Sequence, residues 1–409
     1  MEMAFTMLSR ALNFDPRRSQ FVSEPYILGP ARVAYGDGTA GSARIAIRNG
    51  KIADVLPPEG PSDVALPDGA CIAPGLIDLH TNGADDSLFN RDQGNAVEVA
   101  SRAYARMGTT GFVAGILTAP WESMLHAASE ISEAANQLEE RGERIGARCL
   151  GIHFEGPFLN PKFRRVHRAE WIVNATPERA RALVEACRGA LVMVTMAPEM
   201  PGVNEVARSF FDQGIVCSVG HTGAKYREGM LAIGCGFRTL THAFNAMPPL
   251  DHRDTSILVA FMQEPRTTIQ VICDGYHVSP PMVDLLYRTI GRRMVLATDN
   301  MPPAGSGYRI EGGVMRAEDG TIAGSALHPD QAVRNLMSYS TIPFEEAVVS
   351  ATLTPAHVIG LDREMGRIAR GMRADLSIWS PQYEVLATIV GGEPVYGGAH
   401  LYRTAPQRA

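Results

Sequence analysis

Apolar runs alternate with helix-period segments through the middle of the chain. Eight short apolar runs, from GLIDLH to MVLATD, have the length and aliphatic content of strands that are buried on both faces. Between them lie segments with apolar residues three or four positions apart, such as PERARALVEACRG and NEVARSFFDQG, and several end at a glycine, as helices commonly do. Because alternating strands and helices imply parallel strands, residues 74–362 are predicted to form an α/β fold, a (β/α)8 TIM-type barrel.

Both ends of the chain show a different pattern. Short strand-like pieces between Tyr26 and Ile72 are broken by Asp-Gly and Asn-Gly turn signals. The tail GRIARGMRADLSIWSPQYEVLATIVGGEPVYGG returns to the same strand and turn character. Residues 26–73 and 363–409 are therefore predicted to build one small β-sandwich domain on one side of the barrel, and residues 1–25 are assigned to an N-terminal extension.

Each of the eight apolar runs ends in a polar residue, or in a short loop that carries one. Such residues can bind a metal or move a proton, and barrel enzymes keep their chemistry at the C-terminal ends of the strands. We therefore expect these side chains to converge, and the chain is predicted to be a metal-dependent hydrolase. In chain order they are Asp78 and His80, Thr118, Glu155, Glu199, His221, His242, Asp274 and His277, and Asp299.

Three of these residues form a predicted metal site. Glu155, His221 and His242 offer one carboxylate and two imidazoles, a set that suits zinc or ferrous iron and leaves a fourth position for water. A lone buried glutamate or histidine is more often a core residue, but three strand-end positions in register favour a metal. Asp299 is placed to take a proton from the metal-bound water and to pass it to a leaving nitrogen. Its alternative role is a helix cap or Asx-turn before MPPAG.

A single metal is predicted. His80 and Asn82 form an HxN motif, and asparagine is a poor ligand for transition metals. The fourth apolar run ends in Thr195-Met196 and has no lysine that could be carboxylated into a bridging ligand. We therefore expect one divalent metal per subunit, with zinc preferred and iron, cobalt or manganese as alternatives. His80 and Asn82 would lie next to it or contribute to a weaker second site.

The composition narrows the classes of partner. With 45% hydrophobic and 20% charged residues, the 409-residue chain suits a globular protein with a sizeable core. The net charge of −6 shows no basic excess for nucleic acid or an anionic membrane, so a phosphorylated substrate would have to meet a local basic cluster. No apolar run approaches the ~20 residues of a membrane span, and the first residues lack a secretory h-region. A cytoplasmic protein is expected. Its six scattered cysteines suggest neither a zinc knuckle nor a disulfide scaffold, and Cys149, Cys217 and Cys273, inside apolar runs, are expected to be small core residues.

Six motifs in a fixed order resemble those of the N-acetylglucosamine-6-phosphate deacetylases, which belong to the amidohydrolase superfamily. They are HFEGPFLNP, GHTGA, THAFNAMPPL, DGYHV, LATD and GSAL, and the resemblance runs from about Ile27 through APGLIDLHTNG to the closing GxIxxGxxADLSIW. It implies a barrel with a small β-sandwich, usually a homodimer. It also implies cleavage of an acetamide from a phosphorylated amino sugar, which yields acetate and the free amine.

The resemblance also implies roles for individual residues. It assigns Glu155, His221 and His242 to the metal, Asp299 to general base and acid, and His167 to polarising the amide carbonyl. By sequence alone His167 would be a surface residue among arginines, and Arg253 a solvated loop charge. The resemblance makes Arg253 a phosphate ligand that reaches the neighbouring subunit's active site. The implied substrate-binding residues are Val166, His167, Asn245, Ala246, Arg253, Asp274, His277, Ile322, Ala323 and Gly324.

Departures from the family pattern concern the substrate and leave the metal ligands intact. Asn300 stands in TDNMP where TDAMP is usual, DTSILVAF follows Arg253 where an EPG-like turn is common, and the stretch from Pro161 to Arg165 is unusually basic. We therefore predict deacetylation of N-acetylglucosamine 6-phosphate to glucosamine 6-phosphate and acetate. N-acetylgalactosamine 6-phosphate, an N-acyl-D-amino acid or a cyclic amide are alternative substrates. A catalytically silent binding protein is the alternative outside the enzymes.

Overall fold

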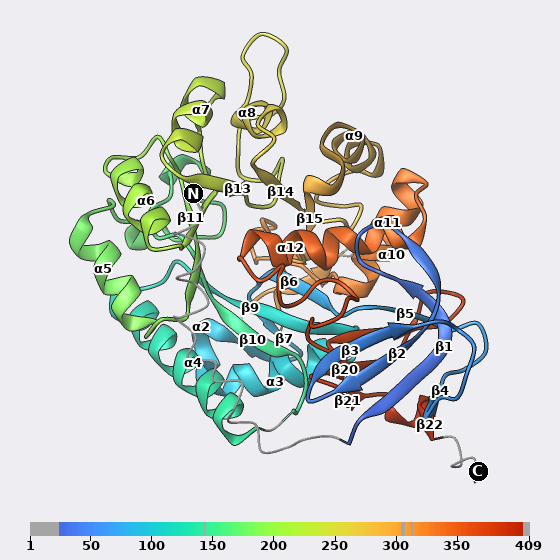
Figure 1. Cartoon of the computed structure of the whole chain (residues 1–409). Coiled ribbons are helices and arrows are strands. Elements are labelled where there is room, and N and C mark those ends of the chain that lie inside the picture. The colour runs from blue at the N-terminus through green and yellow to red at the C-terminus, as the bar shows by residue number, and fades with distance from the viewer. Residues whose placement is uncertain (1–23, 143, 304–306, 312–313, 404–409) are drawn as a thin grey trace.

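The computed structural model describes residues 24–142, 144–303, 307–311 and 314–403 (Figure 1). The predicted N-terminal extension, residues 1–25, therefore lies almost wholly outside the described residues. The described strands form two large sheets. One is a barrel, and the other is a mixed sheet in which strands from the two ends of the chain lie side by side (Figure 1).

The barrel strands follow one another in chain order around one sheet. Every neighbouring pair in this sheet is parallel. Backbone hydrogen bonds join the last strand's end to the first, from Asp299 N to His80 O at 2.8 Å and from Asn82 N to Asn300 O at 2.9 Å. The predicted (β/α)8 TIM-type barrel is confirmed. The strands of this sheet, within the described residues, are β6 (Leu76–Thr81), β9 (Thr109–Leu117), β10 (Arg148–Glu155), β11 (Leu191–Met196), β12 (Val216–Val219), β13 (Phe237–Leu240), β14 (Thr268–Val271) and β15 (Met294–Leu296).

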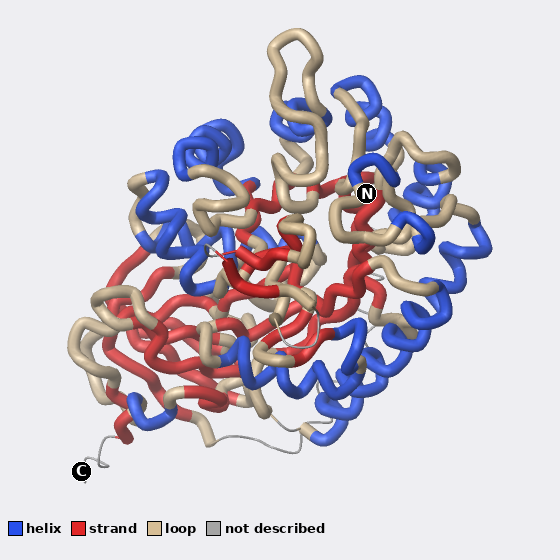
Figure 2. The backbone as a smooth tube through the Cα atoms, turned by 180° about the vertical axis from the view of Figure 1, so that it is seen from behind, coloured by secondary structure: helices blue, strands red, loops and turns tan. Residues whose placement is uncertain are grey.

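Helices lie outside the barrel strands (Figure 2). Each buries one apolar stripe against the strands, as in α6, where Val203, Val206, Ala207 and Phe210 recur at three- and four-residue spacing and are all buried. This packing forms the main core and confirms the predicted helix-period segments. The longer helices are α3 (Gly94–Ala105), α4 (Trp121–Arg141), α5 (Pro177–Ala186), α6 (Val203–Asp212), α7 (Tyr226–Gly234), α8 (Ile257–Gln263), α9 (Pro280–Ile290) and α10 (Pro329–Ser340). Shorter ones are α2 (Phe89–Asp92), α11 (Phe344–Ala347) and α12 (Leu353–Val358).

The second sheet joins the two ends of the chain, as predicted. Its strands β5 (Cys71–Pro74) and β19 (Leu376–Trp379) come from opposite ends of the chain and pair antiparallel, with Ile72 opposite Ile378. It has its own apolar cluster, which includes Leu28, Ile45 and Ile389. The division at residues 73–74 and 362–363 stays a prediction. The strands of this sheet are β1 (Tyr26–Ala34), β2 (Ala40–Arg48), β3 (Lys51–Leu56), β4 (Val64–Ala65), β5 (Cys71–Pro74), β19 (Leu376–Trp379), β20 (Val385–Val390), β21 (Glu393–Tyr396) and β22 (Tyr402–Arg403).

Two small sheets lie in the loops that follow barrel strands. After β6 comes the pair β7 (Gly83–Ala84) and β8 (Ser87–Leu88), and after β15 comes a sheet of β16 (Arg309–Glu311), β17 (Val314–Arg316) and β18 (Ile322–Ser325). The latter is tied to the barrel, because Ser325 N donates to Asp299 O at 2.8 Å. Within the described ranges, no helix has both the length and the apolar character needed to cross a membrane.

Candidate active site

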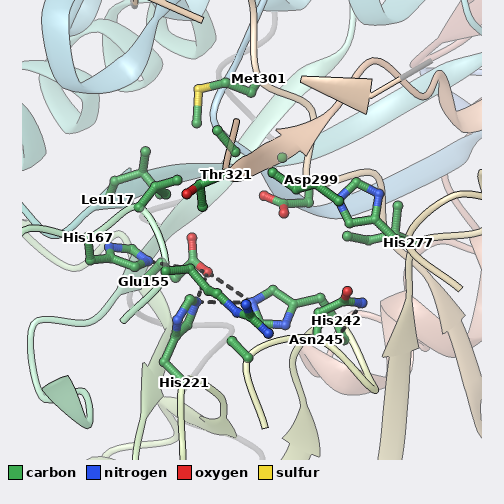
Figure 3. Close-up of a pocket in the computed structure, with 17 residues that line it drawn as sticks. Leu117, Glu155, His167, His221, His242, Asn245, His277, Asp299, Met301 and Thr321 are labelled. Atoms are coloured by element: carbon green, nitrogen blue, oxygen red, sulfur yellow. Dashed lines mark hydrogen bonds and ion pairs between the residues drawn. The ribbon is translucent and has the colours of Figure 1, made fainter. Parts of the chain in front are cut away.

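A cavity of about 260 Å³ opens at the C-terminal ends of the barrel strands. The view in Figure 3 shows acidic and imidazole side chains from several strands pointing toward one another across it. Apolar side chains from neighbouring loops complete its wall. The residues that line it are Leu117, Glu155, Arg165, Val166, His167, His221, His242, Asn245, Ala246, Ile272, His277, Asp299, Met301, Thr321, Ile322, Ala323 and Gly324.

Glu155, His221 and His242 meet at the floor of the cavity. Glu155 Oε1 lies 2.9 Å from His221 Nε2 and 3.1 Å from His242 Nε2, and the two Nε2 atoms are 3.1 Å apart (Figure 3). Ligand atoms around a tetrahedral zinc ion with bonds near 2.05 Å would be separated by about 3.3 Å. The three donor atoms therefore have the chemistry and close to the spacing that one divalent metal requires.

The protonation states of this cluster also suit a metal. Burial, followed by the neighbouring imidazoles, lowers the pKa of both His221 and His242, which leaves them neutral at neutral pH. Burial alone would raise the pKa of Glu155, but the charge of His80 and hydrogen bonds from His167, His221 and His242 hold it well below its usual range. Neutral imidazoles and an ionised carboxylate are the forms that coordinate metals.

The backbone is strained where the functional side chains leave the strands. His221, His242 and Asp299 have φ values of 48°, 32° and 48°, in the left-handed region that residues other than glycine seldom adopt. Each residue lies two or three positions after the end of a barrel strand. Such strain is found most often at functional sites, where the surrounding structure holds it in place. Here it turns all three side chains toward the cavity (Figure 3).

Asp299 faces the cluster and is held from behind by the first strand. Its Oδ1 accepts a hydrogen bond from Asn82 Nδ2 at 2.9 Å and lies 3.5 Å from His80 Nε2. His80 Nε2 is also 3.3 Å from Glu155 Oε2. Burial lowers the pKa of His80, but the charges of Glu155 and Asp299 outweigh it and raise the pKa to about 9.

The motif residues His80 and Asn82 do not line the cavity. Both are fully buried beneath it, and Asn82 contacts Asp299 instead of the Glu155 cluster. His80 reaches Glu155 and Asp299 with one ring nitrogen, so these three groups form a second cluster of donor atoms that shares Glu155 with the first. A role of Asn82 in orienting Asp299 fits the structure better than a role as a metal ligand.

His167 lies in the cavity and not at the surface. It is 3% exposed, and its Nε2 is 3.8 Å from Glu155 Oε1. It belongs to the loop that joins β10 to α5, where the Arg164 guanidinium donates to the His167 carbonyl at 2.9 Å. The same loop orients a member of the cluster, because the Phe163 carbonyl lies 3.0 Å from His221 Nδ1. Arg164 therefore braces the loop that carries a buried imidazole.

Most of the substrate-binding residues implied by the resemblance line the cavity, and two do not. Asp274 lies behind His277, and its Oδ2 is 2.6 Å from His277 Nδ1. Arg253 is exposed on the loop before α8, which projects beyond the rest of the molecule (Figure 1), and it does not line the cavity of its own chain. The residues that do line it are Val166, His167, Asn245, Ala246, His277, Ile322, Ala323 and Gly324.

Five of the predicted strand-end residues do not line the cavity, contrary to expectation: His80 and Asp274, described above, and Thr118, Asp78 and Glu199. Thr118 Oγ1 donates to the Glu155 carbonyl at 2.9 Å, and Asp78 accepts from Thr298 Oγ1 at 2.5 Å. Glu199 Oε1 accepts from Asn160 Nδ2 at 2.8 Å. The hydrogen bonds of Thr118, Asp78 and Glu199 stabilise the strand ends and loops that carry the cavity residues, so these three residues support the site from outside the cavity.

The sequence reasoning missed part of the cavity wall and one buried histidine. Leu117 and Ile272 stand at strand ends and could have been inferred from that position, whereas Arg165, Met301 and Thr321 lie in loops. His153 lies two residues before Glu155 on β10, with its ring edge-on to His80 at 4.8 Å. Its Nε2 lies 2.7 Å from Thr195 Oγ1, in the polar interior of the barrel. The alternation along the strand, HFE, was the signal for it.

The comparisons with known proteins agree with this geometry. The sequence model of the amidohydrolase family matches residues 71–395, which is most of the chain. This chain belongs to the amidohydrolase family. The amidohydrolase is 30% identical over 366 residues to the N-acetylglucosamine-6-phosphate deacetylase of Haemophilus influenzae, a match that covers 85% of this chain and 93% of the relative. It is 28% identical over 361 residues to the N-acetylgalactosamine-6-phosphate deacetylase of Escherichia coli O157:H7, covering 86% and 94%.

A solved structure extends the likeness to the whole fold. A variant of the Mycobacterium smegmatis N-acetyl-D-glucosamine-6-phosphate deacetylase, in complex with N-acetyl-D-glucosamine 6-phosphate, matches this amidohydrolase with a TM-score of 0.84 at 28% identity. The match covers 91% of this chain and all of the other. The resemblance that the six ordered motifs predicted is therefore confirmed.

Proposed function

We propose that this amidohydrolase is a metal-dependent deacetylase of an N-acetylated amino-sugar 6-phosphate, with N-acetylglucosamine 6-phosphate as the substrate. The proposal rests on the groups that lie around one cavity. They are a cluster that could hold a metal (Glu155, His221 and His242), the Asp299 carboxylate and the His167 imidazole. Relatives that are named for the gluco and the galacto substrate are similar to this chain to nearly the same degree. The galacto epimer is therefore the second candidate substrate.

Glu155, His221 and His242 would hold one divalent metal, for which zinc is proposed and iron, cobalt or manganese also fit the ligand set. When bound, such a metal polarises a carbonyl and lowers the pKa of a water molecule toward neutrality. Asp299 takes the proton from the attacking water and passes it to the leaving nitrogen, so that acetate and the amine are formed. Asn82 holds the Asp299 carboxylate in place through the hydrogen bond to Oδ1.

His167 and His277 lie on opposite sides of the cavity in Figure 3, and both would bind the substrate. His167 Nε2 lies close to the Glu155 cluster, where it can donate to the amide carbonyl as negative charge develops on the oxygen. His277 receives its orientation from Asp274, whose Oδ2 pairs with Nδ1 and leaves Nε2 for the sugar. Ile322, Ala323 and Gly324, at the start of β18, would cover the bound sugar.

Asp274→Asn is expected to raise KM by about 10-fold or more with a smaller change in kcat, because the amide can donate to His277 Nδ1 and so reverse the tautomer that faces the sugar. The measurement is steady-state kinetics on the phosphorylated substrate. Asp284→Asn, on the outer helix α9, is the matched control and should behave as wild type. An unchanged KM in Asp274→Asn would show that His277 Nε2 does not bind substrate.

The substrate is tested by the kcat/KM for acetate release from both epimers, each with and without the 6-phosphate. The proposal expects turnover of a phosphorylated epimer and little turnover of the free sugars. Equal turnover with and without the phosphate would favour an N-acyl-D-amino acid or cyclic-amide hydrolase, which has no need of that group. Stoichiometric metal in the purified protein would argue against a silent binding protein.

A further inference from the structure

Arg165 contributes a positive charge to the wall of the cavity. It belongs to the loop between β10 and α5, two positions before His167. Among the described residues that line the cavity, it is the sole lysine or arginine. The Asp299 carboxylate lines the same cavity, and a positive charge in the wall favours an anionic substrate group there.

The backbone at Arg165 is held in an unusual conformation. Its φ is 50°, in the left-handed region that disfavours a side chain. The Arg164 guanidinium fixes this turn by donating to the carbonyls of Arg165 and His167 at 3.2 and 2.9 Å. The two neighbouring arginines therefore differ in role. The Arg164 guanidinium hydrogen-bonds to the loop backbone, whereas Arg165 lines the cavity.

The Arg165 guanidinium is free to bind a ligand. No hydrogen bond or ion pair of this group is found within the part of the chain that the structure describes, and the residue is exposed. By contrast, Arg168 on the same loop lies over the Trp171 ring at 4.8 Å and 4.0 Å from Glu170. A free guanidinium presents a planar fork of N–H donors that matches the oxygens of a phosphate.

We propose that Arg165 binds the 6-phosphate of the substrate from within the same subunit and so sets the preference for a phosphorylated sugar. This assignment rests on the proposed function. It differs from the implied role of Arg253, which lies off the cavity of its own chain and could reach a phosphate only in a second copy. Arg165 then supplies the local positive charge that an acidic protein needs for an anionic substrate.

The test compares R165Q, R165K and K162Q with wild type on the phosphorylated epimer that the wild-type protein deacetylates, and on the corresponding free sugar. R165Q should raise KM for the phosphorylated sugar by about 10- to 100-fold with kcat nearly unchanged, as expected for loss of a charge-assisted hydrogen bond that contributes equally to ground and transition states. Its kcat/KM on the free sugar should equal that of wild type. R165K should recover part of the loss, because lysine keeps the charge without the fork.

K162Q is the matched control. Lys162 is exposed on the same loop and does not line the cavity, so its loss changes the charge of the loop without touching the site. Equal KM values for R165Q and K162Q would overturn the assignment, and a rise in KM in Arg253→Ala alone would place the phosphate contact on a second copy. If the wild-type protein releases acetate from neither phosphorylated epimer, the proposed function is wrong, and the assignment of Arg165 is wrong with it.

Discussion

Asp299→Asn is expected to reduce kcat for acetate release by about 100- to 10,000-fold, the range over which a positioned general acid and base accelerates a reaction. The substitution keeps the shape of the side chain and its contact with the Asn82 amide region but removes the group that accepts the water proton. The metal should stay bound, because the proposed ligands are Glu155, His221 and His242. The measurement pairs steady-state kinetics with metal analysis of the same preparation.

The matched control for this variant is Asp86→Asn, which removes an exposed carboxylate in the loop between β7 and β8. It should retain wild-type kcat and metal content. A near-wild-type kcat in Asp299→Asn would contradict the assigned mechanism. Loss of the metal together with activity would instead make Asp299 a ligand, in the second donor cluster that it forms with His80 and Glu155.

Glu155→Gln is expected to lower metal affinity by at least about 100-fold and to abolish turnover at low metal concentration, since changes even in outer-shell groups cost 10- to 100-fold. Glu155 Oε1 is the atom that lies within 3.1 Å of both cluster imidazoles, and it carries the charge that favours the cation. Affinity is measured by titrating metal into the stripped protein, and turnover is measured at each concentration.

A loss of fold is separated from a loss of metal by the thermal midpoint of the stripped proteins. Glu155→Gln keeps the side-chain volume but removes a buried charge beside His80, so the stripped variant should fold cooperatively with a thermal midpoint below that of stripped wild type. Glu205→Gln, which removes an exposed carboxylate in the first turn of α6, is the matched control and should bind metal as wild type. Unchanged metal affinity in Glu155→Gln would show that Glu155 is not a ligand of the metal.

The barrel and the centre of the site could be predicted from sequence because both depend on strand ends. Eight strand and helix units in succession leave few alternatives to a closed parallel sheet, and the parallel strands bring Glu155, His221, His242 and Asp299 to one end of it. The position of a residue after a strand is fixed by the local pattern. No long-range information is needed to place it at the rim.

The same reasoning failed for residues whose direction depends on loop contacts. Glu199 also follows a barrel strand, yet it turns away from the cavity and accepts hydrogen bonds from Asn160 and the loop after β12. His167 and Arg165 lie in a loop whose path depends on a left-handed residue and on the Arg164 guanidinium. Such contacts leave no periodic signal, so His167 was found through the family motifs and Arg165 only in the structure.

The central claim is tested most directly by acetate release from N-acetylglucosamine 6-phosphate and its galacto epimer, with protein stripped of metal and then reloaded with zinc, iron, cobalt or manganese. We expect no turnover by the stripped protein and restored turnover of a phosphorylated epimer after reloading. Full activity of the stripped protein, or no activity on either epimer after reloading with every one of these metals, would contradict it.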